Sequence, residues 1–204
     1  MSINIASEII TAFITGLLGP VAVIIVKKFV DKKEKTDMVK DTLQMSELVV
    51  SKIEQIREEF DADRVWITQF HNGGHYYPTG KSMAKFSMLY ETVGLGVASV
   101  QSNFQNIPVN LFSKSINELL LNDIIVIPDF KDETVATYGL KYIAEDTGCK
   151  SGYIFSIKTI DGKFIGSLGI DYTKKTTELN DDDILHLSNY ASSIGGVLMN
   201  YLSK

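Results

Sequence analysis

The sequence contains little cysteine, little arginine and no basic stripe, and these shortages exclude several classes of protein. Its single cysteine, Cys149, rules out an intramolecular disulfide and a multi-cysteine metal cluster, and it fits a reducing compartment. The net charge is −5, so nucleic acid is not an expected partner. Only Arg57 and Arg64 are arginines, a bias from which no mechanism follows. No serine or cysteine stands in a recognisable spacing with a histidine, so we expect no enzyme and no catalytic residues.

Charge is also missing from one long stretch near the N-terminus. The stretch from Ile9 to Val26 carries no charged residue, and as a helix it would span roughly 27 Å, close to the hydrocarbon thickness of a bilayer. Lysines follow it directly and only Glu8 precedes it, so the positive-inside rule predicts a single-pass membrane protein with its C-terminal domain in the cytoplasm. The stretch is at the short end of the spanning range, and the alternative is a buried hairpin or an oligomerisation helix.

A helix is predicted between the apolar stretch and residue 62, because apolar residues recur there at spacings of three and four. These residues are Met45, Val49, Ile53, Ile56 and Phe60. The pattern fits the first helix of a domain lying on its sheet, which we favour. It also fits a two-stranded coiled coil that continues from the membrane, and the two interpretations are compatible.

Alternating and apolar runs predict five strands, over residues 63–71, 84–91, 124–129, 151–159 and 163–172. The strand over residues 124–129 is expected to be a central strand of the sheet that ends at Pro128. Asp161-Gly162 predicts a tight hairpin between the last two. Helices are expected from Pro108 through Leu120, from Asp132 or Thr134 to Gly148, and from an N-cap at Asn180 to the C-terminus.

This order of elements resembles the GAF domain, over residues 37–203. The resemblance is most specific in the last third, which has Gly148-Cys149-Lys150-Ser151 entering a strand, a DGK hairpin, the run IGSLGIDY and an acidic first turn in the last helix. It implies an α+β fold with an antiparallel sheet, helices on one face, and a lid of loops and short helices on the other. Members of the family bind small molecules beneath that lid, or bind nothing and only dimerise. We therefore expect a transmembrane anchor at 1–30, a juxtamembrane and first domain helix at 31–62, and a GAF-like domain at 63–204.

The loop between the first two strands carries His71, Asn72, His75 and Tyr77, which we consider as ligand-binding candidates. A spacing of four brings two histidines to one side only on a helix, and the two glycines between them forbid a helix there. No metal site is therefore assigned. The remaining interpretations are a loop whose polar side chains fix its own shape and a loop that contacts a small ligand. The loop also resembles one in GAF-like proteins of tailed bacteriophages.

Aromatic residues on the sheet and lid form a second set of candidates. They are Phe86, Tyr90, Tyr138, Tyr153 and Phe155, with Met88 on the same face as Phe86 and Tyr90. They suit a pocket for a planar ligand, and they suit a plain core equally well. Ser167 and Gly169 remove bulk from one face of the last strand, and either a ligand or a closely packed helix would fill that space.

Together these features predict a membrane-tethered, non-catalytic GAF-like sensory or regulatory module. It would bind a small molecule or a partner protein and form a homodimer through its helices. Cyclic-nucleotide-binding members of the family carry an extended motif, of which Phe130, Asp132 and Glu133 give only a compressed fragment, so the cofactor is left unidentified. The alternative is a phage structural or membrane-acting protein, associated with lysis, in which the GAF-like fold drives assembly.

Overall fold

The computed structural model describes residues 8, 16, 20–24 and 38–202. The chain divides into two units, Met1–Thr42 and Leu43–Lys204, of which the second contains the sheet. Of the predicted membrane span Ile9–Val26, only Gly16 and residues 20–24 are described, so the span lies mostly outside the described residues. No helix among the described residues is both long and apolar enough to cross a membrane. The predicted divisions at residues 30 and 62 stay predictions.

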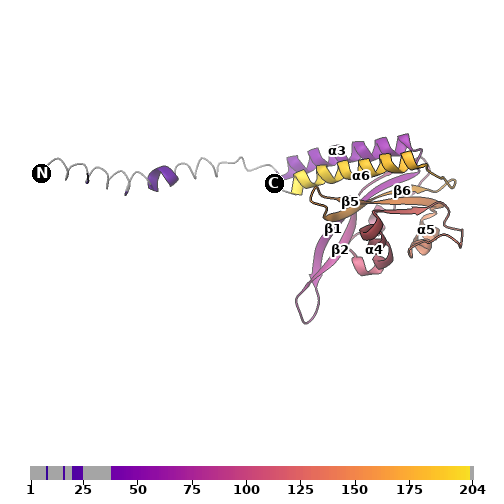
Figure 1. The fold of residues 1–204 in the computed structure, drawn as a ribbon, viewed down its shortest axis with the longest axis horizontal. Coiled ribbons are helices and arrows are strands. Elements are labelled where there is room, and N and C mark those ends of the chain that lie inside the picture. The colour runs from indigo at the N-terminus through magenta and orange to yellow at the C-terminus, as the bar shows by residue number, and fades with distance from the viewer. Residues whose placement is uncertain (1–7, 9–15, 17–19, 25–37, 203–204) are drawn as a thin grey trace. The chain divides into compact units, whose positions relative to one another are not determined.

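The second unit is built on an antiparallel sheet of six strands in the order β3-β2-β1-β6-β5-β4 (Figure 1). The elements in chain order are α3 (Met38–Glu59), β1 (Arg64–His75), β2 (Ser82–Val93), the 3-10 helix η2 (Gln101–Asn103), β3 (Ile107–Pro108), the 3-10 helix η3 (Val109–Phe112), α4 (Ser113–Asn122), β4 (Ile124–Ile127), α5 (Lys141–Thr147), β5 (Ser151–Lys158), β6 (Phe164–Tyr172) and α6 (Asp181–Leu202). The predicted α+β class with an antiparallel sheet flanked by helices is confirmed.

The helices α3 and α6 lie side by side on one face of the sheet (Figure 1). Val49, Ile53 and Ile56 of α3 are fully buried, and each such side chain contributes roughly 1.5–3 kcal/mol when it leaves water. The apolar stripe therefore belongs to the first helix of the domain, as we favoured. At the end of α3 the buried Tyr172 hydroxyl donates a hydrogen bond to the carbonyl of Phe60 at 2.9 Å, which joins this helix to β6.

Two local predictions from short motifs are confirmed. Asn180 caps α6, because its side-chain oxygen accepts from the amide of Asp183 at 2.9 Å and the Asp183 carboxylate accepts from the amide of Asn180 at 3.3 Å. Asp161-Gly162 forms the hairpin between β5 and β6, with Gly162 at a φ of 80° and its amide 2.9 Å from the carbonyl of Thr159. Both motifs act through neighbours in sequence, so the sequence alone specifies them.

The predicted central position of the strand over residues 124–129 is wrong, because β4 is at the edge of the sheet and pairs only with β5. Its sequence is continuously apolar for a different reason. Ile125 and Ile127 are buried under the lid, whereas Val126 points to the other face and is 38% exposed. On that other face Ile124 packs against the core under the helices, so both faces of this edge strand contact apolar clusters, and the run reads like that of a central strand.

The helix predicted from Asp132 or Thr134 to Gly148 is much shorter, because α5 begins only at Lys141. Tyr138 and Gly139 have φ values of 50° and 83°, which a right-handed helix does not allow. The Asp132 carboxylate accepts from the amide and the hydroxyl of Thr134, so it closes a local turn and does not cap a helix. The predicted stop at Gly148 is confirmed as the left-handed C-cap of α5.

Two adjacent glycines of α6 provide a matched test of its packing on the sheet. A Cβ at buried Gly195 would lie 2.4 Å from the carbonyl oxygen of Lys158, whereas a Cβ at exposed Gly196 would have nothing within 4 Å. We expect Gly195→Ala to lower the free energy of unfolding by about 1–3 kcal/mol, since the helix must move off a backbone atom. Gly196→Ala is expected to raise it by about 0.5–1 kcal/mol. Urea unfolding measures both, and equal shifts of the same sign would contradict the packing.

Candidate functional site

A cavity of about 110 Å³ lies between the sheet and the lid, on the face opposite α3 and α6. The lid consists of α4, α5 and the loops around them, below the sheet in Figure 1. Apolar side chains form most of the wall: Phe86, Met88, Val100, Phe104, Phe112, Ile116, Leu119, Phe130, Leu140, Ile143, Ala144 and Ile154. The other lining residues are Arg64, Trp66, Thr68, Ser115, Thr147, Cys149, Ser167 and Asp171.

The sheet side of the cavity is shaped by small residues on β6. A Cβ at Gly169 would lie 2.0 Å from the ring of Trp66, so only glycine leaves room for this indole to lie over the strand. Ser167, two residues earlier on the same face, lines the cavity and is 4% exposed. The space above Gly169 is therefore filled by a side chain from β1, and the space above Ser167 belongs to the cavity.

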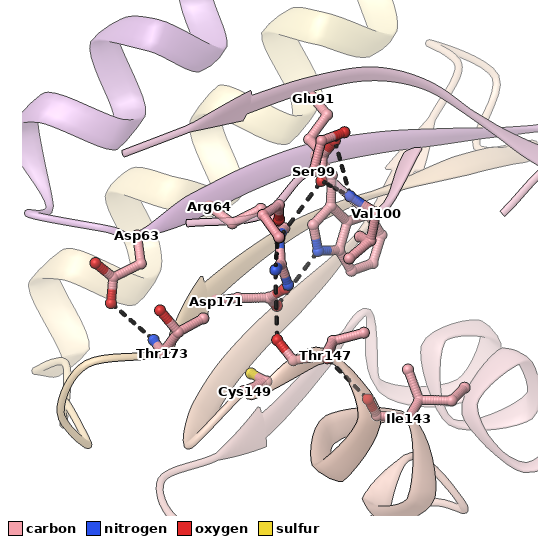
Figure 2. A network of polar contacts seen from close by, with 12 residues as sticks. Asp63, Arg64, Glu91, Ser99, Val100, Ile143, Thr147, Cys149, Asp171 and Thr173 are labelled. Atoms are coloured by element: carbon pink, nitrogen blue, oxygen red, sulfur yellow. Dashed lines mark hydrogen bonds and ion pairs between the residues drawn. The ribbon is translucent and has the colours of Figure 1, made fainter. Parts of the chain in front are cut away.

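One wall of the cavity is built around Arg64 of β1, whose side chain is 1% exposed (Figure 2). Its Nη1 donates to Asp171 Oδ2 at 2.9 Å. Its Nη2 donates to the carbonyl of Ala98 at 3.0 Å and lies 3.4 Å from the carbonyl of Thr147. Its Nε lies 3.4 Å from Glu91 Oε1. A single guanidinium thus joins the sheet to the loop after β2 and to the last residue of α5.

Glu91 of β2 continues this network into the loop after β2. Its carboxylate accepts from the amide of Val100 at 2.9 Å, from the amide of Gln101 at 3.2 Å and from the hydroxyl of Ser99 (Figure 2). The Glu91 side chain is 3% exposed. The loop that carries Ala98 is therefore held from both sides, by Arg64 and by Glu91.

The cavity lining carries one buried cation, Arg64, and one carboxylate, Asp171, whereas Glu91 pairs with Arg64 without lining the cavity. Burial raises the pKa of Asp171, and the Arg64 guanidinium beside it opposes that increase. The indole of Trp66 also donates to Asp171, at 3.3 Å. Burial and the negative charge of Asp171 raise the pKa of the Cys149 thiol, whose sulfur donates to the carbonyl of Ser151 at 3.1 Å. The cysteine is therefore a protonated thiol at neutral pH and not an activated nucleophile.

The predicted loop candidates lie on a hairpin that extends beyond the rest of the sheet (Figure 1). Strand β1 pairs with β6 only as far as Gln69, and His71 onward pairs with β2 alone. His71 shares a hydrogen bond with the Ser87 hydroxyl at 3.0 Å. Asn72, His75 and Tyr77 are exposed, and Tyr77 reaches 97% exposure. These four residues do not line the cavity, and their role as a separate ligand-contacting loop stays a prediction.

Among the aromatic candidates, Phe86 lines the cavity together with Met88. Tyr90 does not share their face, which corrects the predicted alternation. The register of β2 against β1 shifts between the pairs Ile67–Tyr90 and Thr68–Met88, so that β2 holds one extra residue, Leu89. Tyr90 consequently packs against the helix layer, where its hydroxyl lies 3.1 Å from the Ser46 hydroxyl.

The expectation that Tyr153 and Phe155 line the same pocket is wrong. Both belong to the core under α3 and α6, and the Tyr153 hydroxyl donates to the carbonyl of Thr177 at 3.1 Å. On β5 it is Ile154, one position out of phase with them, that reaches the cavity. Tyr138 packs against the lid core without lining the cavity. Alternation placed these residues correctly relative to each other, but it did not tell which face carries the cavity.

Sequence reasoning missed Arg64, Glu91 and Asp171. A usable signal was present for Arg64, because Val65 and Ile67 on one alternating face of its strand and Trp66 and Phe70 on the other are typical of a strand covered on both sides. A guanidinium in such a strand must be buried, and a buried guanidinium requires carboxylate or carbonyl partners. The carboxylate partners, Glu91 and Asp171, are 27 and 107 positions further along the chain, so no local pattern identifies them.

Solved structures of photoreceptor domains share this fold. A far-red cyanobacteriochrome photoreceptor aligns over 91% of this chain and 99% of its own, with 13% identity and a TM-score of 0.61. The blue-light-absorbing form of the PixJ GAF domain of Thermosynechococcus elongatus aligns over 80% and 90%, with 15% identity and a TM-score of 0.62. A solved structure of a far-red-absorbing dark state, with biliverdin IXα bound, aligns over 80% of this chain and 98% of its own, with 14% identity and a TM-score of 0.60.

At these identities the likeness is one of fold, and the predicted GAF-like fold is confirmed. Neither a protein-family model nor a curated protein matches the sequence. The resemblance of the hairpin loop to bacteriophage proteins stays a prediction.

The two arginines of the chain allow a matched test of the buried network. Arg64→Met is expected to lower the free energy of unfolding by about 3–5 kcal/mol, because two carboxylates lose their buried cation. Arg57→Met removes a partly buried guanidinium, 26% exposed, that pairs with the exposed Glu58 at 3.5 Å, and it should cost less, about 1 kcal/mol. Combining Arg64→Met with Asp171→Asn and Glu91→Gln should restore part of the loss in urea unfolding. A triple variant no more stable than Arg64→Met would contradict an electrostatic origin.

Asp63, next to Arg64, predicts a pH dependence. Burial alone would raise its pKa, but hydrogen bonds from the amide and ammonium of Lys174 and the amide of Thr173 together lower it. The carboxylate form is thus favoured by folding, so its stabilisation is present above the unfolded pKa of about 3.9 and is lost as pH falls through the lower native pKa. Asp63→Asn should cost about 1–3 kcal/mol at neutral pH and almost nothing in strong acid.

The control for this variant is Asp61→Asn, whose carboxylate is 87% exposed in a surface ion pair with Lys175. It should leave stability nearly unchanged across the same pH range. A cost of Asp63→Asn that does not vary with pH would show that packing, and not the charge, stabilises this turn.

Proposed function

We propose that this chain is a membrane-tethered, non-catalytic sensory module that binds a small molecule in the cavity between sheet and lid. The observation that carries the proposal is the position of the buried Arg64 network. It forms part of the cavity wall and also joins the lid to the sheet, through Thr147 and Asp171. A ligand that fills the cavity contacts both layers and therefore changes the geometry of the bonds between them.

The composition of the cavity supports a binding role. Ligand sites are lined mainly by apolar and aromatic side chains with a few placed polar groups, and this wall has that composition. Apolar ligand surface that leaves water for this wall contributes about 25 cal/mol per Å². This burial gives binding a driving force without a large interface.

The size of the cavity favours a ligand smaller than a bilin. Biliverdin IXα, bound in one of the similar structures, is an open-chain tetrapyrrole several times larger than benzene. An engineered cavity of about 150 Å³ takes up a single benzene molecule, so a space of about 110 Å³ suits a ligand of about one ring. The protonated Cys149 thiol also gives no support for a covalent chromophore link.

The helix layer is the proposed route for the signal. Arg64 begins the strand that follows α3, and Glu59 at the end of α3 accepts from the Tyr190 hydroxyl of α6 at 2.7 Å. Leu48 of α3 and Leu185 of α6 are 56% and 62% exposed, which supports a homodimer through these helices. In this proposal α3 passes the change toward the N-terminal apolar stretch, which anchors the module to the membrane with the domain in the cytoplasm.

A cavity-filling variant tests the binding proposal. Ala144 of α5 lines the cavity and is 3% exposed, so Ala144→Leu places additional methyl groups in the ligand space. The purified full-length chain is denatured in organic solvent, and released small molecules are measured by mass spectrometry. Wild type should release a molecule in proportion to protein, and Ala144→Leu should release almost none.

Ala84→Leu is the matched control, since it makes the same change at an exposed hairpin position and should behave as wild type. Thermal unfolding midpoints confirm that all three proteins are folded. A wild type that releases nothing, or equal release from Ala144→Leu, would contradict the proposal.

A further inference from the structure

Two hydroxyl side chains in the cavity have no hydrogen-bond partner. Thr68 of β1 and Ser167 of β6 are directly opposite each other in the register of the two strands. Both line the cavity, and they are only 6% and 4% exposed. Within residues 38–202, neither hydroxyl forms a hydrogen bond. Neither oxygen is among the buried, unpaired side-chain atoms of the described residues, which are Arg57 Nε, Arg64 Nε and Thr177 Oγ1. Both oxygens are therefore accessible from the cavity and can pair with the polar group of a molecule that enters it.

The other small polar side chains of the cavity are already paired within the protein. The Ser115 hydroxyl donates to the carbonyl of Tyr138 at 3.0 Å. The Thr147 hydroxyl donates to the carbonyl of Ile143 at 2.8 Å. Among the hydroxyls that line the cavity, those of Thr68 and Ser167 are therefore left to hold the polar group of a ligand, and each has one donor and two acceptor positions.

The charge of the cavity wall selects against anions. The one cation that lines the cavity, Arg64, is already paired with the carboxylates of Asp171 and Glu91, so it is not free to pair with an anionic ligand. An anionic ligand would lose hydration in a mostly apolar space without gaining a free cation, and an unpaired charge costs more there than in water. The rest of the wall is apolar, so a neutral ligand loses least hydration on entry.

We infer that the cavity binds a neutral, largely apolar molecule of about one ring, which carries a hydroxyl or carbonyl group hydrogen-bonded by Thr68 and Ser167. This inference rests on the proposed function, because it defines the ligand of the same cavity. The apolar part of the molecule packs against the lid, on the side of Phe112 and Leu119. Its polar group lies against the sheet, where the two hydroxyls are.

The test compares benzene, phenol and benzoate as probes of the full-length chain. Trp66 is the only tryptophan and lines the cavity, so its fluorescence reports occupancy. Phenol should bind about tenfold more tightly than benzene, since it adds hydrogen bonds to a space that otherwise has unpaired hydroxyls. Benzoate should show no saturable binding at concentrations where phenol saturates.

Paired variants separate the hydroxyls from the rest of the cavity. Thr68→Val with Ser167→Ala keeps the size of the space, so benzene should still bind while the advantage of phenol disappears. Ser115→Ala also removes a hydroxyl from the wall, but one that is already paired, so it should keep the advantage of phenol.

The outcomes distinguish this inference from the proposed function. Binding of benzene and phenol with equal affinity in wild type would overturn the role of Thr68 and Ser167 and leave the cavity as a binding site. The same follows if the double variant still prefers phenol. Tight binding of benzoate would overturn the exclusion of anions. A wild type that binds none of the three probes would overturn both the inference and the proposed function.

Discussion

The buried guanidinium of Arg64 is the interaction on which the arrangement of this domain depends. It connects three segments that are far apart in sequence: β6 through Asp171, the loop after β2 through Ala98, and the end of α5 through Thr147. A lysine at this position carries the same charge but lacks the planar set of donors that reaches several acceptors at once. One side chain thus ties both the lid and the loop after β2 to the sheet.

The two faces of the sheet are packed differently. Under α3 and α6 the core is continuous, with Ile53, Ile67 and Leu168 fully buried in one cluster. Under the lid a smaller cluster surrounds Leu119 and Ile125 and leaves a cavity beside it. Incomplete packing lowers stability locally, and segments of low local stability are those that ligands move most easily. The division suits a module in which one layer supports the fold and the other responds.

Local chemistry explains which features of the fold were predictable. The cap at Asn180, the turn at Asp161-Gly162 and the stop at Gly148 each depend on hydrogen bonds or φ values within a few residues. The apolar stripe of α3 follows from helical geometry alone. In contrast, Tyr90 changed faces because of the extra residue Leu89 in β2, and nothing in the run AKFSMLYE distinguishes a bulge from regular alternation.

The sequence by itself determined the class of the fold, the order of its elements and the absence of redox pairs that follows from a single cysteine. Only the tertiary structure decided which face of the sheet carries the cavity, which strand lies at its edge, and which polar residues meet there. Periodicity states that two residues share a face, but it does not state which layer covers that face. Arg64, Asp171, Thr68 and Ser167 line one cavity because β1 and β6 pair in one register, and pairing between distant strands is decided by the whole chain.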